Sequence, residues 1–133
     1  MTLNGDGSAS APSNAPSAIK AAVAAGNQIR STPYIWGGGH GSFSDRGYDC
    51  SGSVSYVLHA AGVLSSPEAS GPLESWGTSG PGNWITVYAN AGHAWMTVGG
   101  LRFDTSGRSG SGSRWQTGMD AGGGFTVRHY PGL

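Results

Sequence analysis

The fold of this chain is decided by the stretch HAWMTVGGLRFD, residues 93–104. Apolar and more polar residues alternate on both sides of Gly99-Gly100, which is the pattern of β-strands rather than of a helix. Two adjacent glycines accept the backbone angles of a two-residue turn, so the stretch predicts an antiparallel hairpin. The residues on its predicted core face are Ala94, Met96, Val98, Leu101 and Phe103.

The length of this turn fixes which residues lie opposite one another. A two-residue turn pairs Val98 with Leu101 and continues outward from there. On the face away from the core, His93 and Asp104 become diagonal neighbours with backbones roughly 7–8 Å apart, so a carboxylate can orient an imidazole. A slip of one residue would put Asp104 on the opposite face, so this hypothesis depends on the turn.

Two helices are predicted before the hairpin, because apolar residues there recur at intervals of three and four. Ser17 begins the first helix and Cys50 begins the second, which Gly62 terminates. Residues 125–129 predict a last strand. Helices followed by antiparallel strands indicate the α+β class. The apolar positions of the two helices are Ile19, Ala22, Val23, Ile29, Val54, Val57, Leu58 and Ala61.

The domain organisation follows from composition. Residues 1–16 are mostly Gly, Ser, Ala, Pro and Asn, which offer too little apolar surface to offset the entropy of ordering. We therefore expect residues 1–16 to be a flexible linker and residues 17–133 to form one domain. A domain of this size buries roughly two-thirds of the surface that its unfolded chain exposes.

The charge balance excludes several classes of partner. Seven basic and seven acidic residues cancel and are scattered along the chain, so neither nucleic acid nor a membrane surface is an expected partner. The longest apolar runs fall far short of the roughly 20 residues of a membrane-spanning helix. We expect a monomer. The single cysteine excludes an internal disulfide and leaves a choice between a buried, inert thiol and a reactive one.

The neighbours of Cys50 favour the reactive thiol. A nucleophilic thiol needs a lowered pKa, a base within reach and donors for the oxyanion that forms on the attacked carbonyl. The positive end of the predicted helix favours a thiolate at Cys50, His93 can hold the proton, and Asp104 can fix the tautomer of His93. We therefore hypothesise a Cys50 thiolate paired with a His93 imidazolium. Asp104→Asn is expected to lower turnover without unfolding the chain.

Three motifs together resemble the NlpC/P60 cysteine peptidases. These are PYIWGG at residues 33–38, DCSG at residues 49–52 at the start of a helix, and GH at residues 92–93 at the start of a strand. The resemblance runs from about Ser17 to Tyr130, and residues 17–133 would be the catalytic domain. The family often has histidine at the third catalytic position, where this chain has Asp104.

The resemblance implies a papain-like core with the nucleophile at a helix N-terminus, packed against an antiparallel sheet. It also implies a secreted or cell-wall associated enzyme that hydrolyses peptidoglycan stem peptides, commonly between D-glutamate and a diamino acid, and that needs no metal or organic cofactor. By the same resemblance, Tyr34 lies near the thiol, while Asp49 and Ser51 help to hold the amino-terminal side of the substrate. Catalysis would rest on Cys50, His93 and Asp104.

Several alternatives stay open from the sequence. An amidase, a transglutaminase or a deacylase could use the same triad, and a wall-binding module could retain the scaffold without catalysis. Asp104 could simply open a turn through local hydrogen bonds. Tyr34 and Trp36 could be core aromatic residues. His40, in the glycine run, could line the cleft, although a solvated loop histidine is the simpler interpretation.

Overall fold

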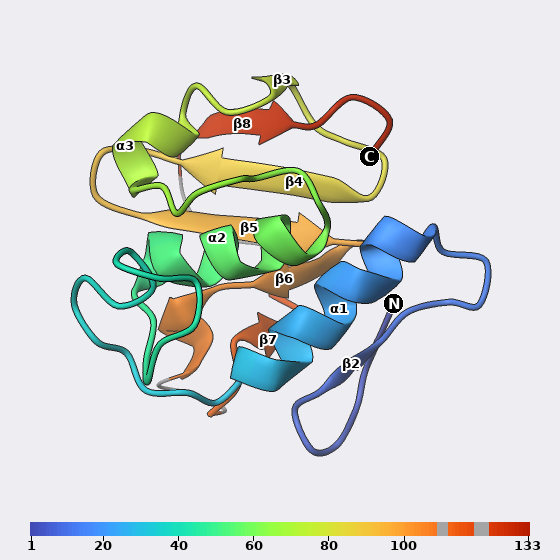
Figure 1. Cartoon of the computed structure of the whole chain (residues 1–133). Helices are drawn as coiled ribbons and strands as arrows, with labels where there is room; N and C mark the ends of the chain where they lie inside the picture. Colours follow the sequence, from blue (N-terminus) through green and yellow to red (C-terminus); the bar gives the residue numbers. More distant parts are fainter. Residues whose placement is uncertain (109–111, 119–122) are drawn as a thin grey trace.

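A six-stranded antiparallel sheet organises the computed structural model, which describes residues 1–108, 112–118 and 123–133. Its strand order is β3-β8-β4-β5-β6-β7, and a separate two-stranded sheet pairs β1 with β2 (Figure 1). The helical elements are α1 Ser17–Ile29, α2 Cys50–Ala60, α3 Ser70–Leu73 and the short 3-10 helix η1 Thr105–Gly107. The strands are β1 Thr2–Leu3, β2 Ala9–Ser10, β3 Thr78–Ser79, β4 Ile85–Ala89, β5 Ala94–Val98, β6 Leu101–Phe103, β7 Trp115–Gln116 and β8 Thr126–His129.

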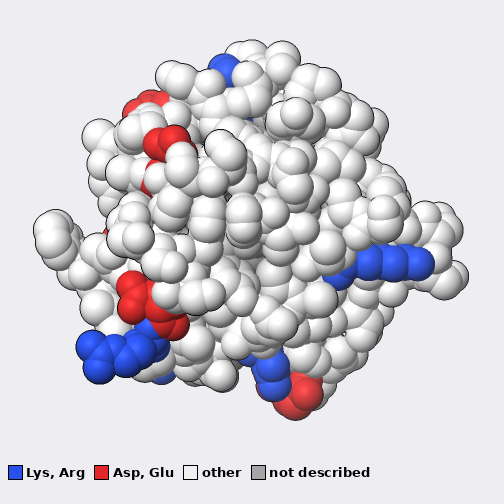
Figure 2. Space-filling view, viewed as in Figure 1, with Lys and Arg blue, Asp and Glu red and all other residues white. Residues whose placement is uncertain are grey.

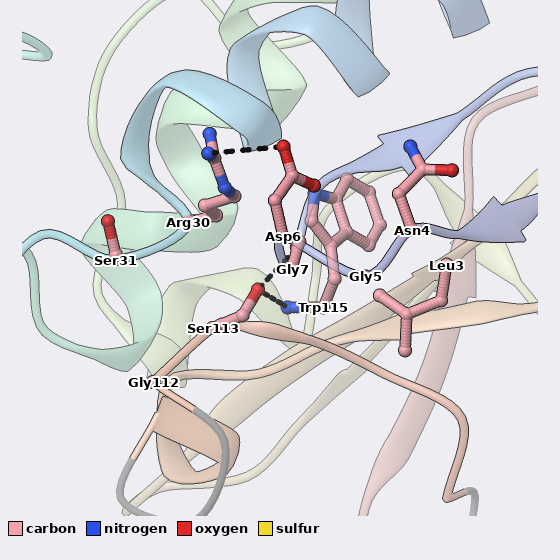
Figure 3. A pocket seen from close by; sticks show the side chains of 10 residues that line it. All are labelled: Leu3, Asn4, Gly5, Asp6, Gly7, Arg30, Ser31, Gly112, Ser113 and Trp115. Carbon is pink, nitrogen blue, oxygen red and sulfur yellow. Dashed lines mark hydrogen bonds and ion pairs between the residues drawn. The ribbon is translucent and has the colours of Figure 1, made fainter.

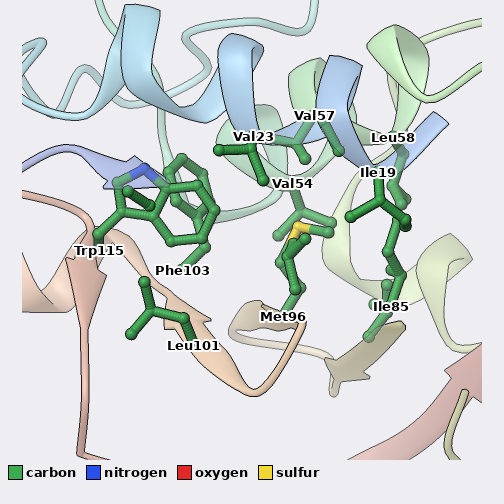
Figure 4. Packing of buried hydrophobic residues seen from close by; sticks show 14 of the residues in the cluster. Ile19, Val23, Val54, Val57, Leu58, Ile85, Met96, Leu101, Phe103 and Trp115 are labelled. Carbon is green, nitrogen blue, oxygen red and sulfur yellow. The ribbon is translucent and has the colours of Figure 1, made fainter. Parts of the chain in front are cut away.

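Helices α1 and α2 lie side by side on one face of the sheet, with α2 packed against β5 (Figure 1). The apolar stripes of both helices meet the inward-facing side chains of β4, β5 and β6, and this contact forms the core (Figure 4). The predicted α+β class is therefore confirmed. Fully buried members of the core are Ile19, Val54, Val57, Leu58, Ile85, Met96, Val98, Phe103 and Trp115.

The hairpin of β5 and β6 has the predicted register. Val98 pairs with Leu101, and Met96 pairs with Phe103. Gly99 and Gly100 have positive φ angles of 58° and 85°, which residues other than glycine rarely adopt. The two-residue turn therefore depends on these two glycines.

The amino-terminal segment corrects the expectation of a flexible linker at residues 1–16. There β1 and β2 form a hairpin that packs beside α1, and Ala9 and Ala15 are buried. Asn27 of α1 both donates to and accepts from the backbone of Ala9, at 2.9 and 2.8 Å. Apolar content alone did not predict this docking, because the apolar side chains that join the core here are mostly small and hydrogen bonds to the backbone add to their contacts.

A cavity of about 310 Å³ lies between this hairpin and the end of α1 (Figure 3). Asp6 and Arg30 form an ion pair of 3.9 Å at its edge, and the Ser113 hydroxyl donates a 2.7 Å hydrogen bond to the carbonyl of Gly7. None of the site residues predicted from the sequence lines this cavity.

Charged side chains are few on the surface of the molecule. Figure 2 shows one face on which the few Lys, Arg, Asp and Glu side chains are scattered among uncharged residues. None of the helices that the structure describes has the length and apolar character that a bilayer crossing needs.

Candidate active site

Cys50 is the first residue of α2 and is partly exposed. The residue before it, Asp49, caps the helix: its Oδ1 accepts a 2.7 Å hydrogen bond from the backbone N–H of Gly52. The backbone N–H groups of a first helical turn have no partner within the helix and carry the positive end of its dipole. The thiol therefore lies where a negative charge is favoured.

The glycine-rich loop before α2 packs directly on the start of this helix. A Cβ on Gly52 would collide with the carbonyl oxygen of Gly38, and the N–H of Asp49 donates to that same oxygen at 3.3 Å. The loop and the helix approach this closely because position 52 is glycine. The approach holds the loop that carries Tyr34 and Trp36 against the nucleophile.

His93 precedes β5 and meets the thiol because α2 packs on that strand. Its backbone N–H donates to Oδ1 of Asn90 at 2.8 Å, which fixes the turn between β4 and β5. Its imidazole is hydrogen-bonded to Asp104 and to Cys50, and these two bonds outweigh burial and raise the pKa of His93 from 6.5 to about 9. The imidazole is therefore an imidazolium at neutral pH.

The environment of Cys50 favours its thiolate. Burial by itself raises the pKa of the thiol, but hydrogen bonds from His93 and from the backbone N–H of Ala94 outweigh burial and bring the pKa below its ordinary value. The structure therefore brings together the sulfur and the imidazole, as the sequence predicted. A thiolate–imidazolium pair is the form that attacks a carbonyl carbon.

Asp104 completes the row of three side chains. Its Oδ1 is 3.0 Å from Nε2 of His93, as the hairpin register predicted. Burial raises the pKa of this carboxyl, but hydrogen bonds from His93, Arg102 and the backbone of Ser106 outweigh it and lower the pKa to about 2. Asp104 also caps η1 through Ser106, so the alternative in which it opens a turn holds at the same time.

Arg102 is a contributor that sequence analysis missed. Its Nε donates to Oδ2 of Asp104 at 3.0 Å, and its guanidinium lies 4.1 Å from the ring centre of Trp95. Trp95 is buried and in turn stacks on the half-buried Tyr88, with ring centres 4.0 Å apart. Arg102 therefore holds Oδ2 of Asp104 in place while Oδ1 of the same carboxylate faces His93.

The two shifted groups keep their charges over a wide range of pH. The stability contributed by protonated His93 is complete below its ordinary pKa of 6.5 and is lost as the pH rises through about 9. The stability contributed by ionised Asp104 is complete above 3.8 and is lost as the pH falls through about 2. Both charges are therefore present between about pH 2 and pH 9.

A buried arginine anchors the two segments that lead into the site. Arg114 is fully buried and donates to the carbonyl oxygens of Ile29, Thr32 and Tyr48, at 2.6, 2.8 and 3.0 Å, and to Ser53 Oγ at 2.9 Å. These bonds fix the chain just before Tyr34 and just before Asp49. No sequence pattern marked this role.

Two cavities flank the thiol and the imidazole. One, of about 480 Å³, is lined by Cys50, Asp49, Ser51, His40 and Trp36 among others. The other, of about 290 Å³, is lined by His93, Thr105, Ser106 and Arg108. Tyr34 lines both cavities and therefore lies between them.

The three residues expected to bind substrate all line the larger cavity. Asp49 and Ser51 contact Nε2 of His40, at 2.8 and 3.1 Å, so His40 belongs to this group rather than to a solvated loop. Tyr34 is 51% exposed and Trp36 is 88% exposed, which excludes them from the core. Burial, followed by the negative charges of Cys50 and Asp49, raises the pKa of Tyr34.

Asp104→Asn is expected to lower turnover by about 100-fold or more, because the amide cannot replace both carboxylate oxygens. One oxygen accepts from His93 and Ser106, and the other accepts from Arg102. Either orientation of the amide turns its NH₂ group toward a donor. Because the buried NH₂ group then faces another donor, the free energy of unfolding should also fall by roughly 1–3 kcal/mol. The sequence alone did not predict this loss.

Turnover of the Asp104→Asn variant is measured below its melting temperature, so that folded protein is compared with folded protein. Unchanged turnover in the folded variant would remove Asp104 from the site.

The described residues contain no group of three or more His, Cys, Asp or Glu side chains arranged to hold a metal ion. Comparison of the chain with models of protein families, with curated proteins and with solved structures finds no match. The resemblance noted from the sequence therefore rests on its three motifs.

Proposed function

We propose that this protein is a cysteine peptidase that hydrolyses peptidoglycan stem peptides. The observation that carries the proposal is the hydrogen-bonded row of Cys50, His93 and Asp104, set at a helix start between two cavities. The thiol has a lowered pKa, its base is an imidazolium, and the carboxylate behind the base is ionised. Together these three conditions activate a thiol for acyl transfer.

The reaction would proceed in two steps. The Cys50 thiolate attacks the peptide carbonyl, and backbone N–H groups at the start of α2 stabilise the oxyanion. Because Nε2 of His93 contacts Asp104, Nδ1 is the nitrogen left to face the thiol and the leaving amine. Nδ1 protonates the amine as the carbon–nitrogen bond breaks and a thioester forms. Water then attacks the thioester, with His93 as base, and releases the acid and the free thiol.

The substrate class is supported by the motifs PYIWGG, DCSG and GH and by their places around the site. Tyr34, Asp49 and Ser51 line the cavity beside Cys50, which suits the role that the resemblance implies for them on the amino-terminal side of the substrate. The D-glutamyl bond to a diamino acid is the proposed cleavage point. The proposal includes a papain-like fold, a monomer, no cofactor, and a location outside the cell or in the cell wall.

Digestion of purified muropeptides tests this function. Mass spectrometry should find products whose summed mass exceeds the substrate by one water for each bond cut, and Cys50→Ala should yield none. Cleavage at a non-peptide bond would favour an amidase or deacylase, and products extended by an added amine would favour a transglutaminase. If the wild type and Cys50→Ala bind the fragments equally and neither cuts them, the protein is a binding module.

A further inference from the structure

The two cavities beside the reacting pair differ in charge. The larger cavity contains the Asp49 carboxylate and no Lys or Arg side chain. Among the described residues, the smaller cavity is lined by the Arg108 guanidinium and by no carboxylate. A substrate lying across both cavities therefore meets a negative group on one side of the scissile bond and a positive group on the other.

The reacting groups define which cavity takes which half of the substrate. Cys50 lines the larger cavity, and the acyl group becomes attached to its sulfur. His93 lines the smaller cavity, and a general acid must lie within hydrogen-bond reach of the leaving nitrogen. The residue that leaves with the amine is therefore placed in the cavity of Arg108.

Arg108 is oriented and has no described anionic partner. Its Nε donates to the carbonyl of Ser31 at 3.2 Å, which holds the side chain across the loop before Tyr34. Within residues 1–108, 112–118 and 123–133, no carboxylate forms an ion pair with Arg108. Burial, followed by the charge of Arg108, lowers the pKa of Arg114 to about 10, so a second guanidinium adds to the positive potential here.

The remaining lining groups suit a small anion. Thr105 and Ser106 belong to the short helix η1 and line the same cavity as Arg108. Thr105 is held by hydrogen bonds of its hydroxyl with Ser53 Oγ and the carbonyl of Asp49, at 3.2 and 3.4 Å. A guanidinium beside a fixed wall matches the planar, two-oxygen geometry of a carboxylate better than it matches a neutral amide.

We propose that Arg108 binds a free carboxylate on the leaving residue of the substrate and so selects peptides that carry this group over their amidated forms. The inference rests on the proposed peptidase activity, because that activity defines the leaving residue. Peptides whose leaving residue ends in a carboxamide lose the charge-assisted hydrogen bonds to the guanidinium. We expect this loss to lower their kcat/KM by about tenfold or more.

The test uses two synthetic stem peptides that differ only in a carboxylate or a carboxamide on the leaving residue. Wild type should favour the carboxylate by about tenfold or more in kcat/KM. Arg108→Gln should bring the ratio close to one by slowing the carboxylate peptide, and Arg108→Lys should retain part of the preference. Arg46→Gln, in an exposed loop outside both cavities, should leave the ratio unchanged.

A second measurement removes the dependence on turnover. Affinities of both peptides for Cys50→Ala, with and without Arg108→Gln, report the same selectivity without cleavage. If wild type cleaves both peptides equally, or Arg108→Gln keeps the preference, the role of Arg108 is overturned while the peptidase stands. If wild type cleaves neither, the peptidase proposal fails. In that case, equal affinities of Cys50→Ala for the two peptides would reject the carboxylate site. A preference of Cys50→Ala for the carboxylate peptide that the added Arg108→Gln change abolishes would support it.

Discussion

His93→Ala is expected to lower turnover of a cleaved stem peptide by roughly 10³- to 10⁴-fold, because the thiol then loses both its hydrogen-bond partner and its general acid. The imidazole contributes to two steps, protonation of the leaving amine and activation of water. Loss of the imidazole also removes the hydrogen bond and, after it, the charge through which His93 lowers the pKa of Cys50. We expect the KM to change far less than kcat, since the ring supports the transition state more than the bound substrate.

The combination of His93→Ala with Cys50→Ala gives the sharper result. Residues that act as one unit show strongly non-additive losses, so the double variant should be no slower than Cys50→Ala alone. Steady-state rates of the three variants, with melting curves for each, provide the comparison. A double variant whose loss equals the product of the two single losses would mean that the thiol and the imidazole act independently.

Arg114→Met is expected to lower the free energy of unfolding by about 3–5 kcal/mol, because it removes the hydrogen bonds of a buried guanidinium to Ser53 and to several backbone carbonyl groups. Methionine fills a similar length of space but donates no hydrogen bond. The carbonyls of Thr32 and Tyr48 would lose the donor that Arg114 supplies, whereas the carbonyl of Ile29 would keep the backbone N–H and the hydroxyl of Thr32 as donors. Because these carbonyls lie just before Tyr34 and Asp49, the residual activity should fall even at temperatures where the variant is folded.

Denaturant unfolding of Arg114→Met, Arg114→Lys and wild type measures this effect. Lysine keeps the charge but has fewer donors in a different geometry, so its loss should be intermediate. Arg30→Met is the matched control, since Arg30 is partly exposed and its ion pair with Asp6 spans 3.9 Å. Exposed ion pairs contribute about 0–1 kcal/mol to the free energy of unfolding. Equal losses for Arg114→Met and Arg30→Met would contradict the anchoring role of Arg114.

The parts of the fold that sequence predicted are those set by local rules. The Gly99-Gly100 turn fixed the register of β5 and β6, and the register alone placed Asp104 beside His93. The start of α2 at Cys50 followed from the apolar period that begins after it, and the structure adds the Asp49 cap. Each of these features depends on residues within a few positions of one another, so a single sequence contains the information.

The parts that sequence missed depend on contacts between distant segments. Arg114 reaches carbonyl groups from residues 29–33 and 48, which no local pattern connects with it. His40 is placed by Asp49 and Ser51 through side-chain bonds across the glycine loop. The hairpin of residues 1–16 docks through hydrogen bonds with Asn27 and through small apolar side chains such as Ala9 and Ala15, which a search for large apolar residues does not detect, so composition predicted a linker instead.

The rate of Cys50 alkylation by iodoacetamide as a function of pH tests the thiolate–imidazolium pair most directly, because it needs no substrate. The wild-type rate should reach half of its maximum well below about pH 8.5, the ordinary midpoint of a free thiol. In His93→Ala the midpoint should rise to about 8.5 or above, since burial then acts on the thiol without the opposing imidazole. A wild-type midpoint near 8.5 that His93→Ala leaves unchanged would contradict the pairing on which the proposed chemistry depends.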